Sequence, residues 1–289
     1  MTAPATLHLA LPKGRMQEGV LKLLGDAGVS VRLGARGYRP TVSLPNVEAK
    51  LLKPQNIIEM LAAGTRDLGF AGADWVAELG VELVEVMDTG LDVVRLVAAA
   101  PEALVPGGIL PDRPVVVASE YERLTTRWIQ ASCPPGSRFV RSYGATEAFP
   151  PEDADCIVDN TATGDTLRAN QLRILGELMR SSTRLYASQR AWADADRRAR
   201  IEDLALLLRS VLEARGRVLV EINIDVAGLA GLVEVLPCMR EPTISLLHGN
   251  SGYAVKVAVR RDQLPALIPK IRARGGTDIV VSSPAQIVP

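Results

Sequence analysis

The chain has 289 residues, of which 47% are hydrophobic and 23% are charged, a composition typical of a folded protein with about two domains. Lys plus Arg and Asp plus Glu both number 33, so the formal net charge is zero and no long-range field favours binding to nucleic acid or to an anionic membrane. The 3 cysteines form no CxxC pair and there are only 2 histidines, which excludes a disulfide framework, a zinc site made of cysteines and a histidine-rich metal site.

The sequence also indicates where the protein works. Its apolar stretches are all shorter than the roughly 18 residues that a membrane-spanning helix needs. Residues 1–14 (MTAPATLHLALPKG) lack the basic start and the long apolar region of a signal peptide. Together with the lack of a disulfide pattern, these features predict a soluble protein of the cytoplasm with no membrane partner.

In the first part of the chain, short apolar runs alternate with helical patterns. Residues 7–11 (LHLAL) predict a buried strand, and apolar residues at helical spacing over 16–27 predict the helix that follows it. This alternation is typical of an α/β fold whose parallel sheet is flanked by helices. The next expected elements are a helix from Pro54 to Gly64 and strands over 67–72 and 93–99.

A Pro- and Gly-rich stretch over residues 101–114 marks the boundary to a second region of the same kind. The elements expected after it, in chain order, are a strand over 115–118, a helix over 121–128, strands over 138–141 and 156–159, a helix over 167–179, a strand over 184–187 and a long amphipathic helix over 201–211.

From residue 217 onward the pattern changes. The order becomes strand, helix, strand, strand, helix, strand, which is the ferredoxin-like βαββαβ arrangement. Residues 253–260 (YAVKVAVR) alternate between apolar and more polar side chains, as in a strand with one buried face. We therefore expect residues 217–289 to form a separate small domain.

The segment over residues 154–172 (ADCIVDNTATGDTLRANQL) carries the clearest chemical signal. It places a small, hydroxyl-rich loop between a buried strand and a helix, where free backbone N–H groups and the helix dipole favour an anion such as phosphate. Gly164 allows close approach of a ligand, and Thr161, Thr163 and Thr166 add hydroxyl groups. The alternative is an ordinary capped helix, and Asp165 opposes an anion unless it points away.

Two carboxylates flank this loop. Glu147 precedes the strand over 156–159, and Asp159 ends it. Beside a phosphate site they could accept hydrogen bonds from ribose hydroxyls and stabilise positive charge at an anomeric carbon. Alternatively, Glu147 is a solvated surface residue and Asp159 a cap. Lys13 and Arg15 follow the first strand, at the carboxyl edge of a sheet where open α/β folds bind ligands.

Several motifs are similar to those of one enzyme family. LPKGRM after the first strand, DLGFAGADWV, the strand around Arg95, VDNTATGDTL and the tail with LPCMREPTISLLHG resemble the ATP phosphoribosyltransferases that open histidine biosynthesis, in their long form. The chain departs from the family pattern with Asn160 and Thr161 in place of two apolar residues, with Asn56 in a stretch that is often Arg-Pro-x-Asp-Ile-Pro, and with Val94 where a cysteine is frequent. In the phosphoribosyl-diphosphate loop, the residues that match the family are Asp159, Thr163, Gly164, Thr166 and Leu167.

The resemblance implies a two-lobed catalytic region of periplasmic-binding-protein style, a type IV phosphoribosyltransferase, with residues 1–99 and 185–214 in one lobe and 100–184 in the other. Residues 217–289 would be a regulatory domain that binds L-histidine as an inhibitor. The implied reaction joins N1 of the ATP adenine to the anomeric carbon of phosphoribosyl diphosphate with loss of pyrophosphate. The implied cofactor is Mg²⁺, held mainly by the substrate pyrophosphate, and the implied assembly is a homo-oligomer, dimer and hexamer.

The resemblance also implies roles for residues. Glu147 and Asp159 would be the catalytic carboxylates. The alternatives are a phosphoribosyltransferase for another base and a non-catalytic two-lobed sensor of small molecules. The implied substrate-binding residues are Lys13, Gly14, Arg15, Lys53, Asp74, Arg95, Thr161, Ala162, Thr163, Gly164, Asp165, Thr166 and Leu167.

Overall fold

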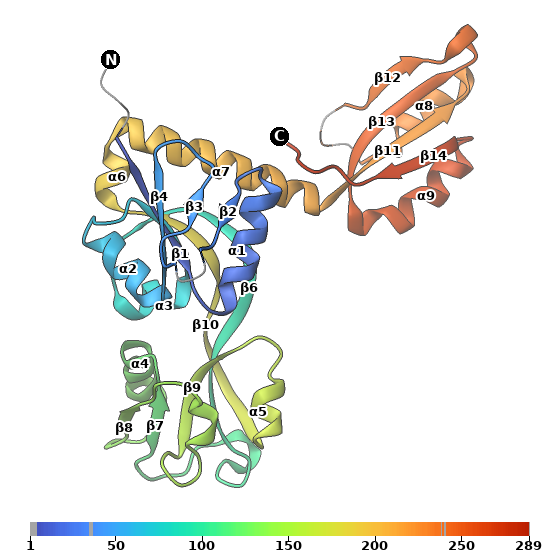
Figure 1. Cartoon of the computed structure of the whole chain (residues 1–289). Coiled ribbons are helices and arrows are strands. Elements are labelled where there is room, and N and C mark those ends of the chain that lie inside the picture. Colours follow the sequence, from blue (N-terminus) through green and yellow to red (C-terminus); the bar gives the residue numbers. More distant parts are fainter. Residues whose placement is uncertain (1–4, 35–36, 238, 240, 289) are drawn as a thin grey trace. The chain divides into compact units, whose positions relative to one another are not determined.

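The computed structural model describes residues 5–34, 37–237, 239 and 241–288. By its internal contacts the chain divides into two compact units, one of Met1–Gly25 with Val29–Ala205 and one of Asp26–Gly28 with Leu206–Pro289. The elements are labelled in Figure 1. The helices are α1 (Arg15–Asp26), α2 (Pro54–Ala62), α3 (Ala73–Leu79), α4 (Glu122–Ser132), α5 (Asp165–Ala169), α6 (Gln189–Ala193), α7 (Ala195–Arg215), α8 (Leu229–Val233) and α9 (Leu264–Ala273).

The larger unit contains one eight-stranded sheet with the order β4-β1-β5-β10-β6-β9-β7-β8. Strand β1 pairs in parallel with β4 and β5 in one half of the sheet, and β7 pairs in parallel with β8 and β9 in the other half. The strands are β1 (Leu7–Pro12), β4 (Val47–Leu52), β5 (Leu68–Gly72), β6 (Val84–Pro101), β7 (Val116–Ser119), β8 (Arg138–Arg141), β9 (Cys156–Thr161) and β10 (Leu172–Ala187), and β2 (Val31–Arg32) and β3 (Thr41–Val42) form a separate small pair.

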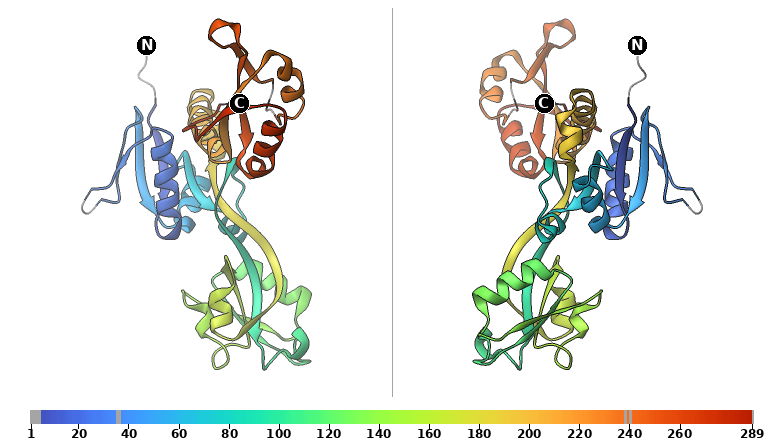
Figure 2. Two further views of the ribbon diagram at one scale, coloured as in Figure 1. Left: turned by 90° about the vertical axis from the view of Figure 1, so that its right-hand side faces the viewer. Right: turned by 90° about the vertical axis from the view of Figure 1, so that its left-hand side faces the viewer.

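The two halves of this sheet are joined by β6 and β10. These strands of 18 and 16 residues pair antiparallel along almost their whole length, with several register shifts (Figure 2). Each half buries its own apolar cluster, with Ile57, Ile58 and Leu61 of α2 in one and Val117, Tyr121 and Ile129 in the other. The α/β class predicted from the sequence is confirmed. The lobe limits predicted at residues 99 and 185 lie within β6 and β10, and the division into three parts stays a prediction.

One predicted element is wrong. The helix expected over residues 167–179 is the five-residue α5 followed by strand β10. Gln171 has a φ of +55°, which ends the helical path, and the chain then pairs with β6 from Leu172 onward. Long-range strand pairing thus overrides the helical spacing of LRILGELM. The strands expected over 93–99 and 184–187 are parts of the longer β6 and β10.

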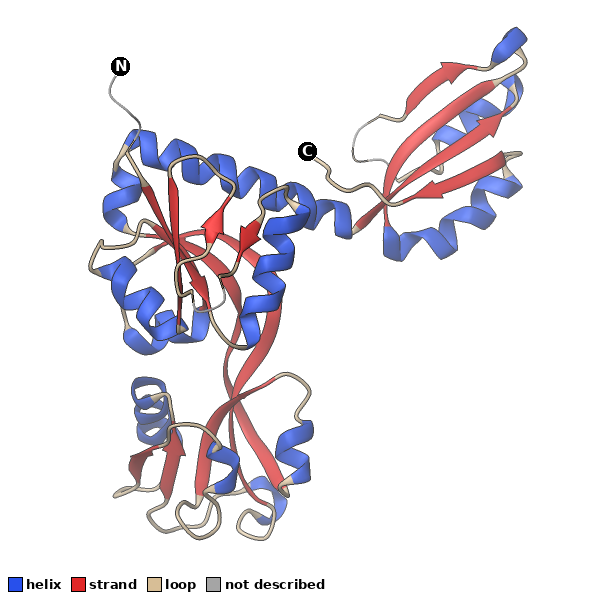
Figure 3. Ribbon diagram, viewed as in Figure 1, coloured by secondary structure: helices blue, strands red, loops and turns tan. Residues whose placement is uncertain are grey.

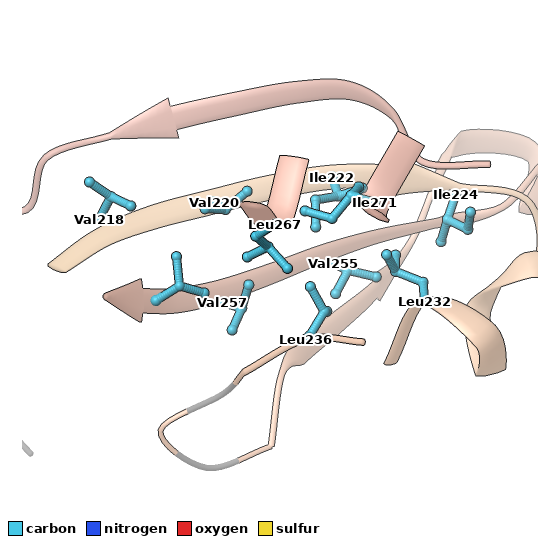
Figure 4. Close-up of a cluster of buried hydrophobic side chains, with 11 residues drawn as sticks. Val218, Val220, Ile222, Ile224, Leu232, Leu236, Val255, Val257, Leu267 and Ile271 are labelled. Carbon is cyan, nitrogen blue, oxygen red and sulfur yellow. The ribbon is translucent and has the colours of Figure 1, made fainter. Parts of the chain in front are cut away.

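The smaller unit has the βαββαβ order that the sequence predicts. Its strands β11 (Arg217–Ile224), β12 (Thr243–Leu246), β13 (Tyr253–Arg260) and β14 (Thr277–Ser282) form an antiparallel sheet with the order β12-β13-β11-β14. Helices α8 and α9 lie on the same face of this sheet (Figure 3). Its core, drawn in Figure 4, is formed by alternate strand residues such as Val220, Ile222 and Val257 packed against Leu267 and Ile271 of α9.

Two observations bear on the chain's environment. Among the described helices, none is long and apolar enough to cross a membrane. Cys133 and Cys156 are free thiols, and burial raises the pKa of Cys156 to about 12, so that it stays protonated. Cys238, the remaining cysteine of the sequence, lies outside the described residues.

Candidate active site

A pocket with a volume of about 330 Å³ lies at the carboxyl end of β9. Most of its lining comes from the loop between β9 and α5, the segment that the sequence predicts to bind an anion. Arg15, from the first turn of α1, also borders it. The lining residues are Arg15, Glu147, Asp159, Asn160, Thr161, Ala162, Thr163, Asp165, Thr166 and Leu167.

The loop has a defined internal geometry. Gly164 adopts a φ of +84°, a conformation that a side chain would strain, and its N–H donates to Oγ1 of Thr161 over 2.9 Å. Thr161 is buried, and its hydroxyl oxygen holds the turn by accepting this hydrogen bond from Gly164. Thr163 and Thr166 are exposed. The sequence predicts that the helix dipole helps to attract an anion, but α5 has only five residues and its dipole is small. An anion at this loop would therefore be held mainly by local N–H and hydroxyl donors.

The charge of Asp165 is offset within the loop. Its carboxylate accepts hydrogen bonds from Thr163 Oγ1 and from the guanidinium of Arg168. The hydrogen bond from Thr163 and then the one from Arg168 lower the pKa of Asp165. The side chain is 73% exposed, so this pair is solvated and its negative charge is screened from the pocket.

The two predicted carboxylates meet at this pocket. Glu147 lies in a short 3₁₀ helix, Thr146–Ala148, and Asp159 lies near the end of β9. Burial raises the pKa of Asp159 to about 6, and the negative charge of Glu147 acts in the same direction. The N–H of Asn160, 2.7 Å from Oδ1 of Asp159, and the more distant Arg15 oppose the rise. An ionised Asp159 is therefore poorly solvated and gains from any positive charge that appears beside it.

One further predicted residue, Arg95, lies next to the loop. Arg95 of β6 is the Cα partner of Thr161 in the ladder between β6 and β9, and its Nη1 is 3.7 Å from Oε2 of Glu177. Arg95 is thus a cation at the base of the loop, only weakly held by its carboxylate neighbour.

Other predicted residues lie apart from this pocket. The Lys13 ammonium is 3.4 Å from the centroid of the Tyr38 ring, and Gly14, with a φ of +81°, borders a separate hollow along α1. Lys53 precedes α2 and borders a second pocket, described below. Asp74 is buried in α3, and its carboxylate accepts hydrogen bonds from Tyr121 and Ser181. Their substrate-binding roles stay predictions.

A second pocket of about 320 Å³ includes residues that the sequence analysis missed. Arg141, Ser142 and Tyr143 come at the carboxyl end of β8, an edge where open α/β sheets bind ligands, and this position is the signal that could have identified them. Asn160, which lines the first pocket, was noted only as a departure from the family pattern. The lining of the second pocket is Lys53, Gln55, Glu59, Trp75, Glu78, Leu79, Glu120, Arg141, Ser142 and Tyr143.

Comparison with known proteins gives matches over both units. Residues 53–210 match the family model described as ATP phosphoribosyltransferase, and residues 214–283 match the model described as the HisG C-terminal domain. A curated ATP phosphoribosyltransferase of Chlorobaculum parvum is 35% identical over 278 residues, which cover 94% of this chain and 94% of that protein. That of Pelotomaculum thermopropionicum is 33% identical over 289 residues, covering 98% and 99%.

A solved structure is similar as well. The chain from the ATP phosphoribosyl transferase (HisG:HisZ) complex of Thermotoga maritima superposes with a TM-score of 0.63 at 26% sequence identity. The match covers 72% of this chain and 99% of that chain.

The raised pKa of Asp159 predicts that its ionised carboxylate lowers the stability of the folded protein. Because the folded pKa of about 6 lies above the ordinary value of 3.8, ionisation of Asp159 opposes folding above pH 6, and this cost disappears as the pH falls through 6 toward 4. Asp159→Asn should therefore raise the thermal midpoint at pH 8 by roughly 2 to 4 °C, about 1 kcal/mol after screening by water, and by less at pH 5. Differential scanning calorimetry at both pH values measures this.

The matched control is Asp153→Asn, an exposed acid of the same region, whose midpoint should not change. A midpoint for Asp159→Asn that lies below that of the unmodified chain at pH 8 would mean that the carboxylate is stabilised in place.

Proposed function

The chain belongs to the ATP phosphoribosyltransferase family, and from that premise we propose that the pocket at the end of β9 is the phosphoribosyl-diphosphate site. The chain is an enzyme of the first step of L-histidine biosynthesis, in which the phosphoribosyl group of phosphoribosyl diphosphate is transferred to ATP and pyrophosphate leaves. The observation that supports the assignment of the site is that one pocket contains the hydroxyl-rich loop, two carboxylates and a basic side chain.

The loop would hold the 5-phosphate of the substrate. Gly164 has no side chain, so the phosphate can approach the backbone between Thr163 and Thr166. Thr166 is exposed and its hydroxyl can donate to a phosphate oxygen, whereas the hydroxyl of Thr163, which donates to the carboxylate of Asp165, would have to turn from Asp165 to the phosphate. Ala162, Asp165 and Leu167 would contribute backbone contacts, since the carboxylate of Asp165 is bound to Arg168.

Asp159 and Glu147 would lie beside the ribose. Their oxygens can accept hydrogen bonds from the vicinal hydroxyls of the sugar. As the bond to pyrophosphate lengthens, positive charge develops at the anomeric carbon, and the poorly solvated carboxylate of Asp159 stabilises that charge more than it stabilises the neutral ground state. Attack by N1 of the adenine then completes the transfer with inversion, and no nucleophile from the protein takes part.

The basic residues would serve the leaving group and the second substrate. Arg15 borders the pocket and Arg95 lies opposite Thr161 at the base of the loop, so both would approach phosphate oxygens. Lys13, Gly14, Lys53 and Asp74 are proposed as further substrate contacts on the strength of the family pattern. Each basic residue would neutralise charge that pyrophosphate gains as it departs.

Mg²⁺ is proposed as the cofactor. Among the described residues no group of three or more His, Cys, Asp or Glu side chains is arranged to hold a metal ion. The residues present therefore fit a metal that is bound mainly through pyrophosphate oxygens of the substrate, with at most one or two carboxylates of the protein. When bound, Mg²⁺ would neutralise charge on the leaving pyrophosphate.

The C-terminal unit would make the enzyme responsive to L-histidine, the end product of the pathway. We base this on the match of residues 214–283 to the C-terminal domain of the family. L-Histidine would bind there, and binding would be coupled to the catalytic site by a free energy of interaction between two distinct sites. We also propose a homo-oligomer, dimer and hexamer, working in the cytoplasm.

Release of pyrophosphate from ATP plus phosphoribosyl diphosphate tests the activity directly. A phosphoribosyltransferase for another base would release pyrophosphate only when given that base, and a sensor would bind ligand without turnover. Neither alternative is favoured by the comparisons, since the relatives are ATP phosphoribosyltransferases along almost the whole chain.

Gly164→Val is predicted to abolish binding of phosphoribosyl diphosphate in a folded protein. A β-branched side chain is strained at a φ of +84°, and its Cβ would lie 3.3 Å from the guanidinium of Arg168. Calorimetric titration with phosphoribosyl diphosphate measures the loss. Gly107→Val is the control for backbone strain, because Gly107 also has a positive φ (+70°), has open space around it and does not line the pocket. An unchanged Michaelis constant in the folded variant contradicts the assignment of the loop.

Asp159→Asn and Glu147→Gln are each predicted to lower turnover. Each removes negative charge beside the developing cation and keeps the shape of the side chain, so the more important of the two should cost roughly 2 to 4 kcal/mol of transition-state stabilisation. Steady-state kcat at saturating substrates reports the loss. If both variants turned over as fast as the unmodified enzyme, the carboxylates would not face the ribose.

L-Histidine is predicted to bind the full chain and to inhibit it without competing with phosphoribosyl diphosphate. Calorimetry should give a heat of binding, and by reciprocity the affinity for histidine should change when phosphoribosyl diphosphate is present. No heat of binding, together with turnover indifferent to histidine, would refute the regulatory role and leave the transferase activity untouched.

A further inference from the structure

Helix α3 meets the start of α4 along a contact that we call the α3–α4 seam, formed by Asp74, Trp75 and Glu78 on one side and Tyr121, Arg123 and Leu124 on the other. The rings of Trp75 and Tyr121 stack with centroids 4.6 Å apart. The Tyr121 hydroxyl donates to Oδ2 of Asp74 over 2.6 Å. The seam therefore joins the half of the sheet that contains β5 to the half that contains β7.

Glu78 closes the seam by capping a helix that belongs to the other half. Its Oε1 accepts from the N–H of Arg123 over 2.9 Å, and its Oε2 accepts from the N–H of Leu124 over 3.0 Å. The N-cap residue of α4, Tyr121, makes no side-chain capping bond, so these N–H groups depend on Glu78. Glu78 is only 8% exposed, and its negative charge also complements the N-terminal end of the α4 dipole.

The contact is reciprocal. The guanidinium of Arg123 lies over Gly80, where α3 ends, so closely that a Cβ on Gly80 would collide with it. A cation at this position complements the carbonyl end of α3. The seam thus pairs the end of each helix with an opposite charge from the other helix.

The seam also reaches the substrate loop. The side-chain amide of Asn160 donates to the Tyr121 hydroxyl over 2.9 Å, and Asn160 directly follows Asp159. On the other side, Oδ1 of Asp74 accepts from Ser181 Oγ of β10 over 2.7 Å. A continuous chain of hydrogen bonds therefore runs from Asn160 of β9, through Tyr121 and Asp74, to β10.

We propose that Glu78 is a positioning residue for the transfer reaction: by capping α4 across the seam, it fixes Tyr121 and, through Asn160, the carboxylate of Asp159 relative to the half of the molecule that carries Arg15. This inference rests on the proposed role of the pocket at β9. Outside the seam, the described chain passes between the two halves through β6 and β10, whose register shifts bend and twist the paired strands.

If the cap from Glu78 were lost, the alignment of the reacting groups would suffer more than the binding of phosphoribosyl diphosphate. Phosphoribosyl diphosphate would still be held by the loop of one half, whereas its anomeric carbon would no longer be held at a fixed distance from groups of the other half. A displacement of about 1 Å can reduce the rate by roughly a hundredfold. Glu78→Ala should therefore lower kcat at least tenfold and leave the dissociation constant of phosphoribosyl diphosphate, measured by calorimetry, within twofold.

The matched controls are Glu82→Ala, an exposed acid just beyond α3, which should keep the unmodified kcat, and Glu78→Gln, which keeps one good acceptor oxygen and should restore most of it. In a Tyr121→Phe background, which has already lost the link to Asn160, Glu78→Ala should cost less than threefold. If Glu78 only stabilised the fold, part of the Glu78→Ala protein would be unfolded, and calorimetry would give fewer binding sites per chain. The effect of Glu78→Ala on kcat would then add to that of Tyr121→Phe.

The outcomes separate this inference from the assignment of the loop. An unchanged kcat for folded Glu78→Ala overturns the inference, as does a fall in kcat that is fully additive with Tyr121→Phe. An unchanged Michaelis constant in Gly164→Val overturns the assignment of the loop, whatever Glu78→Ala does.

Discussion

Strands β6 and β10 pair antiparallel over nearly their whole length, and the eight-stranded sheet of the larger unit depends on this pairing. On one side β10 pairs with β5, and on the other β6 pairs with β9, so the two strands make one continuous sheet out of two parallel groups. The same ladder between β6 and β9 places Arg95 opposite Thr161, at the base of the loop between β9 and α5. The position of the loop is therefore set by backbone hydrogen bonds between segments distant in sequence, and not by the loop alone.

The electrostatics of the site are local. A chain with a formal net charge of zero cannot attract a polyanionic substrate by its overall field, so attraction must come from groups at the pocket. In the site that we propose, Arg15 and the donors of the loop would supply this attraction, while Arg168 offsets the charge of Asp165. Asp159 is the exception, a carboxylate kept in a poorly solvated place beside Glu147. This cost to stability is understandable if the carboxylate acts on a cation that exists only during the reaction.

The sequence predicted which residues come together at the pocket of β9 better than it predicted the path of the chain around them. Glu147, Asp159 and the threonines could be identified because their types and spacing reflect the chemistry of a phosphorylated sugar, and the structure brings them to one pocket. The βαββαβ tail was predictable in part because β11 and β13 each have one buried face, so that buried apolar residues alternate with more exposed ones along these strands.

The rest depends on contacts that leave no local pattern. Residues 172–179, the first half of β10, were interpreted as part of a helix because LRILGELM has helical spacing, and only the pairing with β6 decides otherwise. The capping of α4 by Glu78 was not predictable either, since the two lie 44 or more residues apart and an acid near a helix end is common on any surface. Asn160 stood out only as a departure from the family pattern, and its partner Tyr121 could not be inferred from spacing.

A crystal structure of the full chain with phosphoribosyl diphosphate and Mg²⁺ tests the central claim most directly. The account predicts the 5-phosphate against the backbone and hydroxyls of residues 163–166, with the ribose hydroxyls on the carboxylate of Asp159. A phosphoribosyl group bound elsewhere, with the loop between β9 and α5 empty, would contradict it.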